Sequence, residues 1–247
     1  MTNKIFVYHR AINSESNYDE FLQTSKSINH AIAAEGDLCW TTINNKSLIY
    51  IYHPDLSGKS ISKEKLSELY NSNNLLTIEK IFSMDSKKNF ILELKDGDDD
   101  IESFLTELKL IIAKYSVKNI LVDAFSVEYL KKVKDIIPEV KTSLHTKMIS
   151  GKNVLETTYQ FPYIKFHNLY DLNFIDYITI SYSTTHVNLF DLNIDSTYRH
   201  VYQSNKKLNL GSIKNIEAFD KAMKSKVEYI YLRSKEVKKY VFEKFIN

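Results

Sequence analysis

Apolar residues follow two alternating patterns along this chain of 247 residues. Short apolar runs of strand length recur, and the stretches between them place apolar residues at the i, i+3, i+4 and i+7 spacing of an amphipathic helix. Strands that alternate with helices indicate an α/β fold with a parallel sheet. The predicted strands are Ile5–His9, Ala33–Trp40, Leu48–His53, Phe90–Leu94, Asn119–Ala124, Val140–His145, Tyr177–Tyr182, Lys207–Leu210 and Val227–Leu232.

The clearest predicted helix is Ile101–Tyr115, whose apolar residues keep the helical spacing throughout. Asp98, Asp99 and Asp100 precede it, and negative charge there favours the positive end of a helix. Other helices are predicted to open at Asn17 with Phe21, Ile28 and Ile32 on one face, to run from about Ser126 until Pro138 ends it, and to cover Asn215–Lys224 and about Ser234 to Phe245.

The number of predicted strands is close to eight, with one extra hairpin-like strand near the second, and helices follow most of them. This pattern predicts a single-domain (β/α)8 TIM barrel over residues 1–247, with a small insert at about 54–88. Five glycines, three prolines and the lack of a linker-like stretch agree with one domain. The active site of such a barrel lies at the carboxyl ends of its strands.

The composition of the chain argues against several classes of protein. A net charge of +2 argues against a general nucleic-acid binder. Cys39 is the only cysteine, which excludes an internal disulfide and a thiol-metal cluster. No apolar run approaches the ~20 residues of a membrane span. The first residues lead directly into the first predicted strand without a signal peptide, so a cytoplasmic protein is expected. The sequence gives no signal for an oligomeric state.

Charged residues stand at or near the predicted strand ends. Side chains two apart on a strand share a face, so Glu35 lies with Asp37 and Glu93 lies with Lys95. Charges beside apolar strands are costly unless they are paired or bind a metal. His9-Arg10 ends the first strand and His53 ends the third run. Carboxylates, imidazoles and cations in this combination suit a hard divalent cation and a phosphate ester.

Simpler interpretations stay open for each group. Gly36 permits a surface turn that would carry Glu35 and Asp37. Glu93 and Lys95 form a plain ion pair in the simplest interpretation, and a histidine at a strand end is by itself more often a core or surface residue. Packing or surface roles are expected for the remaining histidines His145, His167, His186 and His200. The less favoured alternative for His145 is a substrate contact together with Lys147, since both come near the end of a strand at the predicted rim.

Over about its first hundred residues the chain resembles the glycerophosphodiester phosphodiesterase family of the phospholipase-C-like barrels. The matching segments, in order, are His9-Arg10-Ala11 for the His-Arg-Gly of the family, Glu15-Ser16-Asn17, Glu35-Gly36-Asp37 with Thr41, His53-Pro54-Asp55, a leucine-rich helix at Lys65–Leu69, Leu76–Ile81, and Glu93-Leu94-Lys95. Val122-Asp123-Ala124-Phe125 looks like a weakened form of the strand that follows in the family.

The resemblance implies a metal-dependent hydrolase that cleaves a glycerophosphodiester into glycerol phosphate and an alcohol. It implies that Glu35, Asp37 and Glu93 hold one divalent cation, Mg²⁺ or Ca²⁺. Arg10 and Lys95 would bind the phosphate of this small-molecule substrate. His9 and His53 would be the catalytic acid and base. Either water or a neighbouring glycerol hydroxyl could be the nucleophile, and the implied process is lipid metabolism.

The carboxyl-terminal half departs from the family. Leu208-Asn209-Leu210-Gly211 stands where the family has Trp-Thr-x-Asn, and Leu232-Arg233-Ser234-Lys235 replaces Thr-Asp-x-Pro. These positions shape the substrate pocket, which puts the leaving group in doubt. Two alternatives follow: a related barrel phosphodiesterase for a lysophospholipid, a sphingolipid or a glycerol-phosphate-bearing surface polymer, and a non-catalytic barrel that binds phosphorylated ligands.

Overall fold

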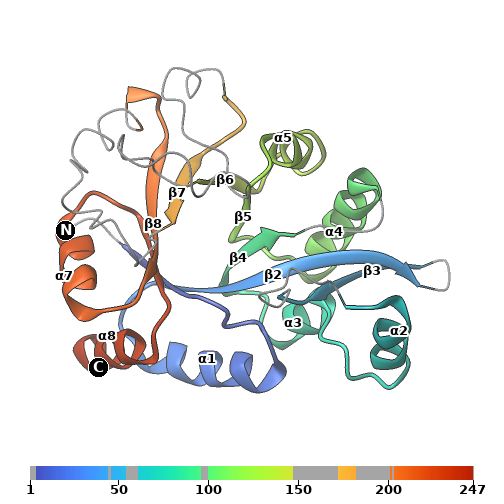
Figure 1. The fold of residues 1–247 in the computed structure, drawn as a ribbon, viewed down its shortest axis with the longest axis horizontal. Helices are drawn as coiled ribbons and strands as arrows, with labels where there is room; N and C mark the ends of the chain where they lie inside the picture. Colours follow the sequence, from blue (N-terminus) through green and yellow to red (C-terminus); the bar gives the residue numbers. More distant parts are fainter. Residues whose placement is uncertain are drawn as a thin grey trace.

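Eight parallel strands close into a barrel in the computed structural model, which describes residues 4–43, 46–53, 61–95, 100–146, 172–181, 201 and 203–246. The barrel closes because β1 (Ile5–Tyr8) pairs with β2 (Ile32–Ile43) on one side and with β9 (Tyr229–Leu232) on the other. The strands between β2 and β9 are β4 (Asn89–Leu94), β5 (Ile120–Ala124), β6 (Lys141–Thr146), β7 (Tyr177–Ser181) and β8 (Lys207–Ile213). The predicted TIM barrel is confirmed (Figure 1).

The ninth strand, β3 (Lys46–Ile51), pairs antiparallel with β2 and stays outside the closed barrel. The expected hairpin-like strand near the second is therefore confirmed. β2 is twelve residues long, so it extends beyond the barrel, and β3 returns along it until Ile51 lies beside Leu38. The antiparallel hairpin thus brings the chain after β3 back to the carboxyl-terminal mouth of the barrel.

Helices surround the strands on the outside (Figure 1). In each helix described, a polar side chain at the N-cap accepts a hydrogen bond from the amide three residues later. The helices are α1 (Glu15–Ser27), α2 (Lys63–Asn71), α3 (Ile78–Met84), α4 (Ile101–Tyr115), α5 (Val127–Ile136), α7 (Ile216–Lys224) and α8 (Lys235–Phe245), and their caps are Ser14, Ser62, Thr77, Asp100, Ser126, Asn215 and Ser234.

The predicted start of the first helix is wrong by several residues. Asn17 is not the cap, because its own amide donates to Ser14 Oγ over 3.2 Å. The apolar face assigned to this helix is also too long. Ile28 caps the carboxyl end of α1, and Ile32 is the first residue of β2. A helical spacing that continues by chance into the next strand misplaced both residues.

The large core lies between the barrel and its helices, and a smaller apolar layer fills the inside of the barrel. The interior layer consists of Val7, Ala33, Ile91, Leu121, Tyr177, Tyr229 and Tyr231, with Ile5 packed against it. Because strand side chains alternate between faces, the residues two positions further along also face inward. These next positions are polar on several strands, so the polar groups gather directly above an apolar floor.

Among the residues described, none of the helices combines the length and apolar character that a membrane crossing would need.

Candidate active site

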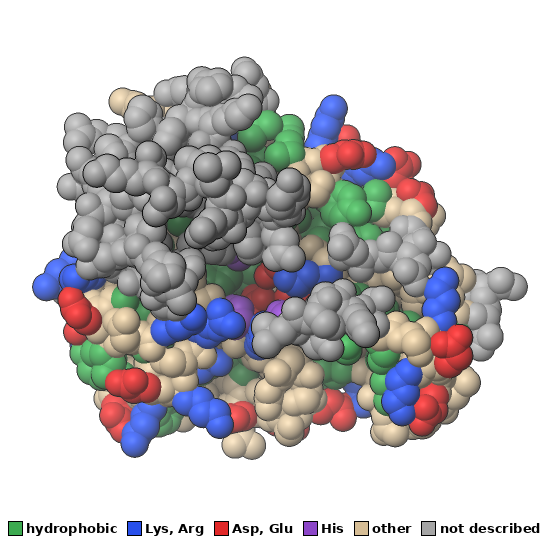
Figure 2. Space-filling model, viewed as in Figure 1, with side chains coloured by type: hydrophobic (Ala, Val, Ile, Leu, Met, Phe, Trp, Pro, Cys, Tyr) green, Lys and Arg blue, Asp and Glu red, His purple; other side chains and the backbone are tan. Residues whose placement is uncertain are grey.

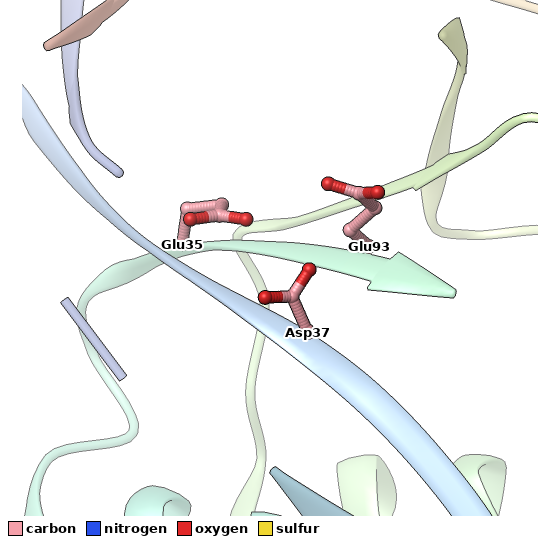
Figure 3. A group of neighbouring side chains, drawn as sticks. All are labelled: Glu35, Asp37 and Glu93. Atoms are coloured by element: carbon pink, nitrogen blue, oxygen red, sulfur yellow. The ribbon is translucent and has the colours of Figure 1, made fainter. Parts of the chain in front are cut away.

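Three carboxylates converge at the mouth of the barrel. Glu35 and Asp37 project from β2, and Glu93 projects from β4, where its Cα is the register partner of Asp37. One oxygen of each carboxylate lies within 4.8 Å of the others (Figure 3). The three residues are buried, with only 1%, 4% and 7% of their surfaces exposed. The surface-turn interpretation of Glu35 and Asp37 is therefore wrong, since both lie inside a strand.

Gly36 separates the two carboxylates of β2 on the opposite, outward face of the strand. A Cβ atom there would lie 2.9 Å from Cβ of Ile12 and 3.2 Å from its carbonyl oxygen. Ile12 belongs to the segment after β1, and its amide donates to the carbonyl oxygen of Glu35 over 3.1 Å. Glycine is required here by close packing against that segment, and not by a turn.

The cluster concentrates negative charge where water is excluded. Burial, followed by repulsion from Asp37 and Glu93, raises the pKa of Glu35 well above its usual value. Burial and the charge of Glu93 also raise the pKa of Asp37. Carboxylate oxygens are the ligands preferred by Mg²⁺ and Ca²⁺, and a cation would remove the repulsion between them. The residues present therefore fit a hard divalent cation.

Lys95 joins the cluster from the end of β4. Its Nζ lies 2.9 Å from Asp37 Oδ1 and also donates to Glu93 Oε1. The backbone amide of Lys95 donates to the carbonyl oxygen of Leu38 over 2.9 Å, which fixes it beside β2. Burial alone would lower the pKa of Lys95, but the Glu93 and Asp37 charges and hydrogen bonds raise it. The ion pair of Lys95 with Glu93 is real, and it is part of a larger site.

Arg10 connects the first strand to the cluster. Its backbone amide donates to Glu35 Oε2, and its guanidinium Nη2 contacts Nε2 of His53. Arg10 has a left-handed backbone with φ of 57° in the turn directly after β1. His53 is brought to the same place by the hairpin, because the amide of Tyr52 donates to the carbonyl oxygen of Asp37. Nε2 of His53 lies 3.9 Å from Asp37 Oδ2.

His9 directly follows β1 and precedes Arg10 in the chain. Its amide donates to the carbonyl oxygen of Leu232 on β9, and Lys238 Nζ donates to its carbonyl oxygen over 3.0 Å. Burial and the charges of Arg10, Arg233 and Lys238 lower the pKa of His9 to about 2. The imidazole is therefore neutral at neutral pH. The residues predicted for the site thus lie at one end of the barrel.

Sequence reasoning gave little weight to a second polar group on the neighbouring strands. His145 on β6 places Nδ1 at 3.1 Å from Asp123 Oδ2 on β5. The hydroxyl of Tyr231 on β9 donates to the same oxygen over 3.4 Å. The strand alternation could have identified Asp123, since it follows Leu121 by two positions in the same way that Glu93 follows Ile91. His145 was placed near the rim, and it does lie there.

Other residues singled out in the sequence lie outside the described part of the chain: Pro54, Asp55, Asp98, Asp99, Lys147, His167, Tyr182, His186 and His200. On the face drawn in Figure 2, acidic and histidine side chains gather at the centre, and Lys and Arg side chains border them. Side chains of both charges therefore meet at the centre of this face.

The sequence matches no family model and no curated protein. Solved structures do match. A glycerophosphodiester phosphodiesterase from Parabacteroides distasonis aligns over 98% of both chains at 16% identity with a TM-score of 0.63. A phosphodiesterase from Oleispira antarctica, in complex with the product sn-glycerol-3-phosphate, covers 98% of this chain and 97% of its own at 12% identity with a TM-score of 0.66.

A mutant tryptophan synthase α-subunit from Pyrococcus furiosus also matches, at 14% identity and a TM-score of 0.55 over 99% of this chain and 96% of its own. The barrel is thus shared with an enzyme of a different kind, and fold alone does not decide function. At these identities the likeness establishes that the chain has the fold of solved glycerophosphodiester phosphodiesterases. The chemistry has to be argued from the side chains.

Proposed function

We propose that this protein is a metal-dependent glycerophosphodiester phosphodiesterase, a phosphoric diester hydrolase that releases glycerol phosphate and an alcohol. The observation that carries the proposal is the convergence of Glu35, Asp37 and Glu93, with Lys95, at the mouth of the barrel. Two solved phosphodiesterases share this fold over nearly the whole chain, and one of them holds glycerol phosphate.

Glu35, Asp37 and Glu93 are the residues that would hold the cation, Mg²⁺ or Ca²⁺. When bound, the cation would supply charge stabilisation for a phosphoryl oxygen and would orient the diester. Lys95 and Arg10 would neutralise the rest of the phosphate charge. Arg10 suits this role because a guanidinium can bind two oxygens at once. Its amide is already fixed by Glu35, so the side chain starts from a defined position.

His9 and His53 would transfer the protons of the reaction. A neutral imidazole can accept a proton, and His9, whose backbone is held by Leu232 and Lys238 beside Arg10, is assigned as the base. It would take the proton from the attacking water or glycerol hydroxyl as the new P–O bond forms. His53, next to Asp37 and Arg10, would give a proton to the alkoxide as the old P–O bond breaks. Such proton transfer contributes about 10²–10⁴-fold.

The test is hydrolysis by the purified protein of a panel of diesters, each with Mg²⁺ or with Ca²⁺. The panel includes a glycerophosphodiester, a lysophospholipid, a sphingomyelin-like lipid and a glycerol-phosphate polymer. The proposal is supported if the glycerophosphodiester is hydrolysed and if EDTA abolishes this hydrolysis. His9→Ala and Glu35→Ala should abolish it, and Glu139→Ala, at an exposed carboxylate, should leave it unchanged.

Activity that survives EDTA and both substitutions would refute the metal and histidine assignments. Hydrolysis of a lipid or polymer substrate alone would move the function to the related phosphodiesterases. Calorimetry completes the test, because tight binding of glycerol phosphate without turnover under either cation would favour a non-catalytic barrel.

A further inference from the structure

We infer that His145, held by Asp123, is a third imidazole of this site and binds a phosphoryl oxygen of the substrate through Nε2. The inference rests on the proposed function, which places a phosphate ester at the neighbouring carboxylate cluster. It adds a substrate contact from β6 on the side of the cluster opposite to His9. In this arrangement His145 binds the substrate, and Asp123 is a positioning residue.

Strand register places the pair next to the cluster. Asp123 on β5 is the register partner of Glu93 on β4, so the two side chains point into the barrel at the same level. His145 lies on β6, which pairs with β5. Moving around the barrel from β2 to β6, one therefore meets Asp37, Glu93, Asp123 and His145 in turn. A ligand on the carboxylates is bordered by His145 on this side.

The Asp123–His145 pair is buried and geometrically defined. The side chain of Asp123 is 1% exposed, that of His145 is 13% exposed, and Nδ1 lies 3.1 Å from Oδ2. A carboxylate at Nδ1 makes that nitrogen a donor and fixes the plane of the ring. Nε2, separated from Nδ1 by one ring carbon, is the second hydrogen-bonding atom of the ring. Burial alone would lower the pKa of His145, but the charge and hydrogen bond of Asp123 raise it, which favours the cation that a phosphate would bind.

A second support comes from across the barrel. Tyr231 of β9 spans the interior, and its hydroxyl reaches the same Oδ2 of Asp123. Gly211 of β8 makes room for this tyrosine, because a Cβ there would lie 2.7 Å from Tyr231 Cβ and 2.8 Å from Cγ. Three strands therefore contribute to holding one carboxylate oxygen in place. The other oxygen of Asp123, Oδ1, is buried without a hydrogen-bond partner among the described residues.

The ring of His145 is also linked to Lys95, the lysine proposed above to bind the phosphate. The ring of Phe125 lies 4.6 Å from that of His145, and Lys95 Nζ lies 5.5 Å from the centre of the Phe125 ring. Phe125 thus forms an apolar bridge between two groups of positive character that would contact one phosphate. An apolar wall beside a charge-assisted hydrogen bond strengthens it by excluding water.

A purely structural role for the pair is the competing explanation, and amide substitutions separate the two. The side-chain nitrogen of asparagine takes the place of histidine Nδ1, whereas that of glutamine takes the place of Nε2. His145→Asn keeps the bond to Asp123 and loses Nε2, the atom inferred to contact the substrate. His145→Gln keeps a donor at the Nε2 position. A structural role is rescued by asparagine, and a substrate contact is rescued by glutamine.

The experiment is calorimetric titration of glycerol phosphate into the protein loaded with Mg²⁺ or Ca²⁺, with melting temperatures measured in parallel. We expect His145→Asn to weaken binding about tenfold or more with little change in melting temperature, because a charge-assisted hydrogen bond is lost. His145→Gln should lose at most about threefold in its affinity for glycerol phosphate relative to the wild type. Ser143→Ala is the matched control. Ser143 lies two residues earlier on the same face of β6 and bonds Thr179 rather than Asp123, so it should bind as the wild type does.

Wild-type affinity in His145→Asn, or a loss confined to His145→Gln, would overturn the inference even if the protein hydrolyses its diester. Absence of glycerol phosphate binding by the wild type would overturn it as well. Conversely, the expected binding pattern without any hydrolysis would support His145 and refute the proposed function. If His145→Asn does not fold, Asp123→Asn replaces it, since it keeps the shape and removes the charge. It should weaken binding several-fold, and unchanged affinity would refute the inference.

Discussion

At the scale of single residues, the site is a balance between buried negative charge and the groups that offset it. Glu35 is 1% exposed and, among the described residues, its carboxylate receives the amide of Arg10. Lys95 bonds Asp37 and Glu93 instead. Glu35 therefore has the least direct compensation, and its carboxylate should destabilise the metal-free fold while serving the bound cation.

Glu35→Gln tests this balance. The amide oxygen can still accept from Arg10, but the buried charge is removed. We expect the melting temperature of the metal-free variant at pH 8 to exceed that of the wild type by about 2–5 °C. Mg²⁺ or Ca²⁺ at a concentration 100 times the dissociation constant should then raise the free energy of unfolding of the wild type by about 2.7 kcal/mol. The melting temperature of the wild type should rise accordingly, and that of the variant should stay almost unchanged.

The pH dependence sharpens the comparison. The folded pKa of Glu35 is raised above the ordinary value of 4.5, so between these two values the folded protein holds a proton that the unfolded chain has lost. The metal-free wild type should lose stability relative to Glu35→Gln as the pH rises through that window. Scanning calorimetry from pH 5 to 8 with EDTA measures the difference. A difference that shrinks with rising pH would contradict the account.

At the scale of elements, inward positions on the strands change from apolar to polar at the mouth. β4 shows this best, since Ile91 belongs to the apolar floor while Glu93 and Lys95 lie in the site. This alternation is readable in the sequence, and it is why the carboxylates could be placed together in advance. Asp123 follows the same rule but has no pairing signal nearby in the sequence. Its partners His145 and Tyr231 are 22 and 108 residues away.

Local cues predicted most of the barrel elements but not all their limits. Ser126, Asn215 and Ser234 were identified as helix starts because cap residues act within a few positions. The cap at Ser14 was missed because Asn17 offered an equally good local pattern. The role of Gly36 could not be read either, because it depends on packing against Ile12 after a chain reversal.

Gly36→Ala tests this packing. The added Cβ would press on Ile12, whose backbone belongs to the segment that carries His9 and Arg10. We expect a loss of about 1–3 kcal/mol in the free energy of unfolding, measured by urea denaturation, together with weaker diester hydrolysis. Thr42→Ala, at an exposed position of the same strand, is the control and should change neither quantity by much. Equal stability of the two variants would show that the close approach to Ile12 is relieved at no cost.

At the scale of the whole molecule, the two ends of the chain close the barrel together. The amide of Asn29 donates to the carbonyl oxygen of Phe245, and Ile28 forms an isolated bridge with Ile246. The ammonium of Lys4 is buried against the carbonyl oxygens of Ser225 and Val227, at 2.6 and 2.9 Å. The first strand is thus held by contacts from the last fifth of the chain. The barrel should therefore unfold as one unit.

Val237→Ala tests this cooperativity. Val237 of α8 is fully buried near the closing strand pair, and the truncation should cost about 2 kcal/mol. Trp40, the only tryptophan of the chain, lies on β2. Its ring stacks on that of Phe104 in α4, with the ring centres 4.3 Å apart. In one cooperative unit, urea unfolding followed by Trp40 fluorescence and by circular dichroism should shift to the same lower midpoint.

Val133→Ala in α5 supplies the comparison, since this valine is equally buried on another side of the barrel. It should move both signals together in the same way. The contrary result is specific: if Val237→Ala lowers the midpoint by circular dichroism while the Trp40 midpoint stays in place, the segments around β1 and α8 unfold separately. The carboxylates on β2 and β4 could then keep their arrangement without the strand that carries His9 and Arg10. Cation binding and hydrolysis would be lost at different urea concentrations.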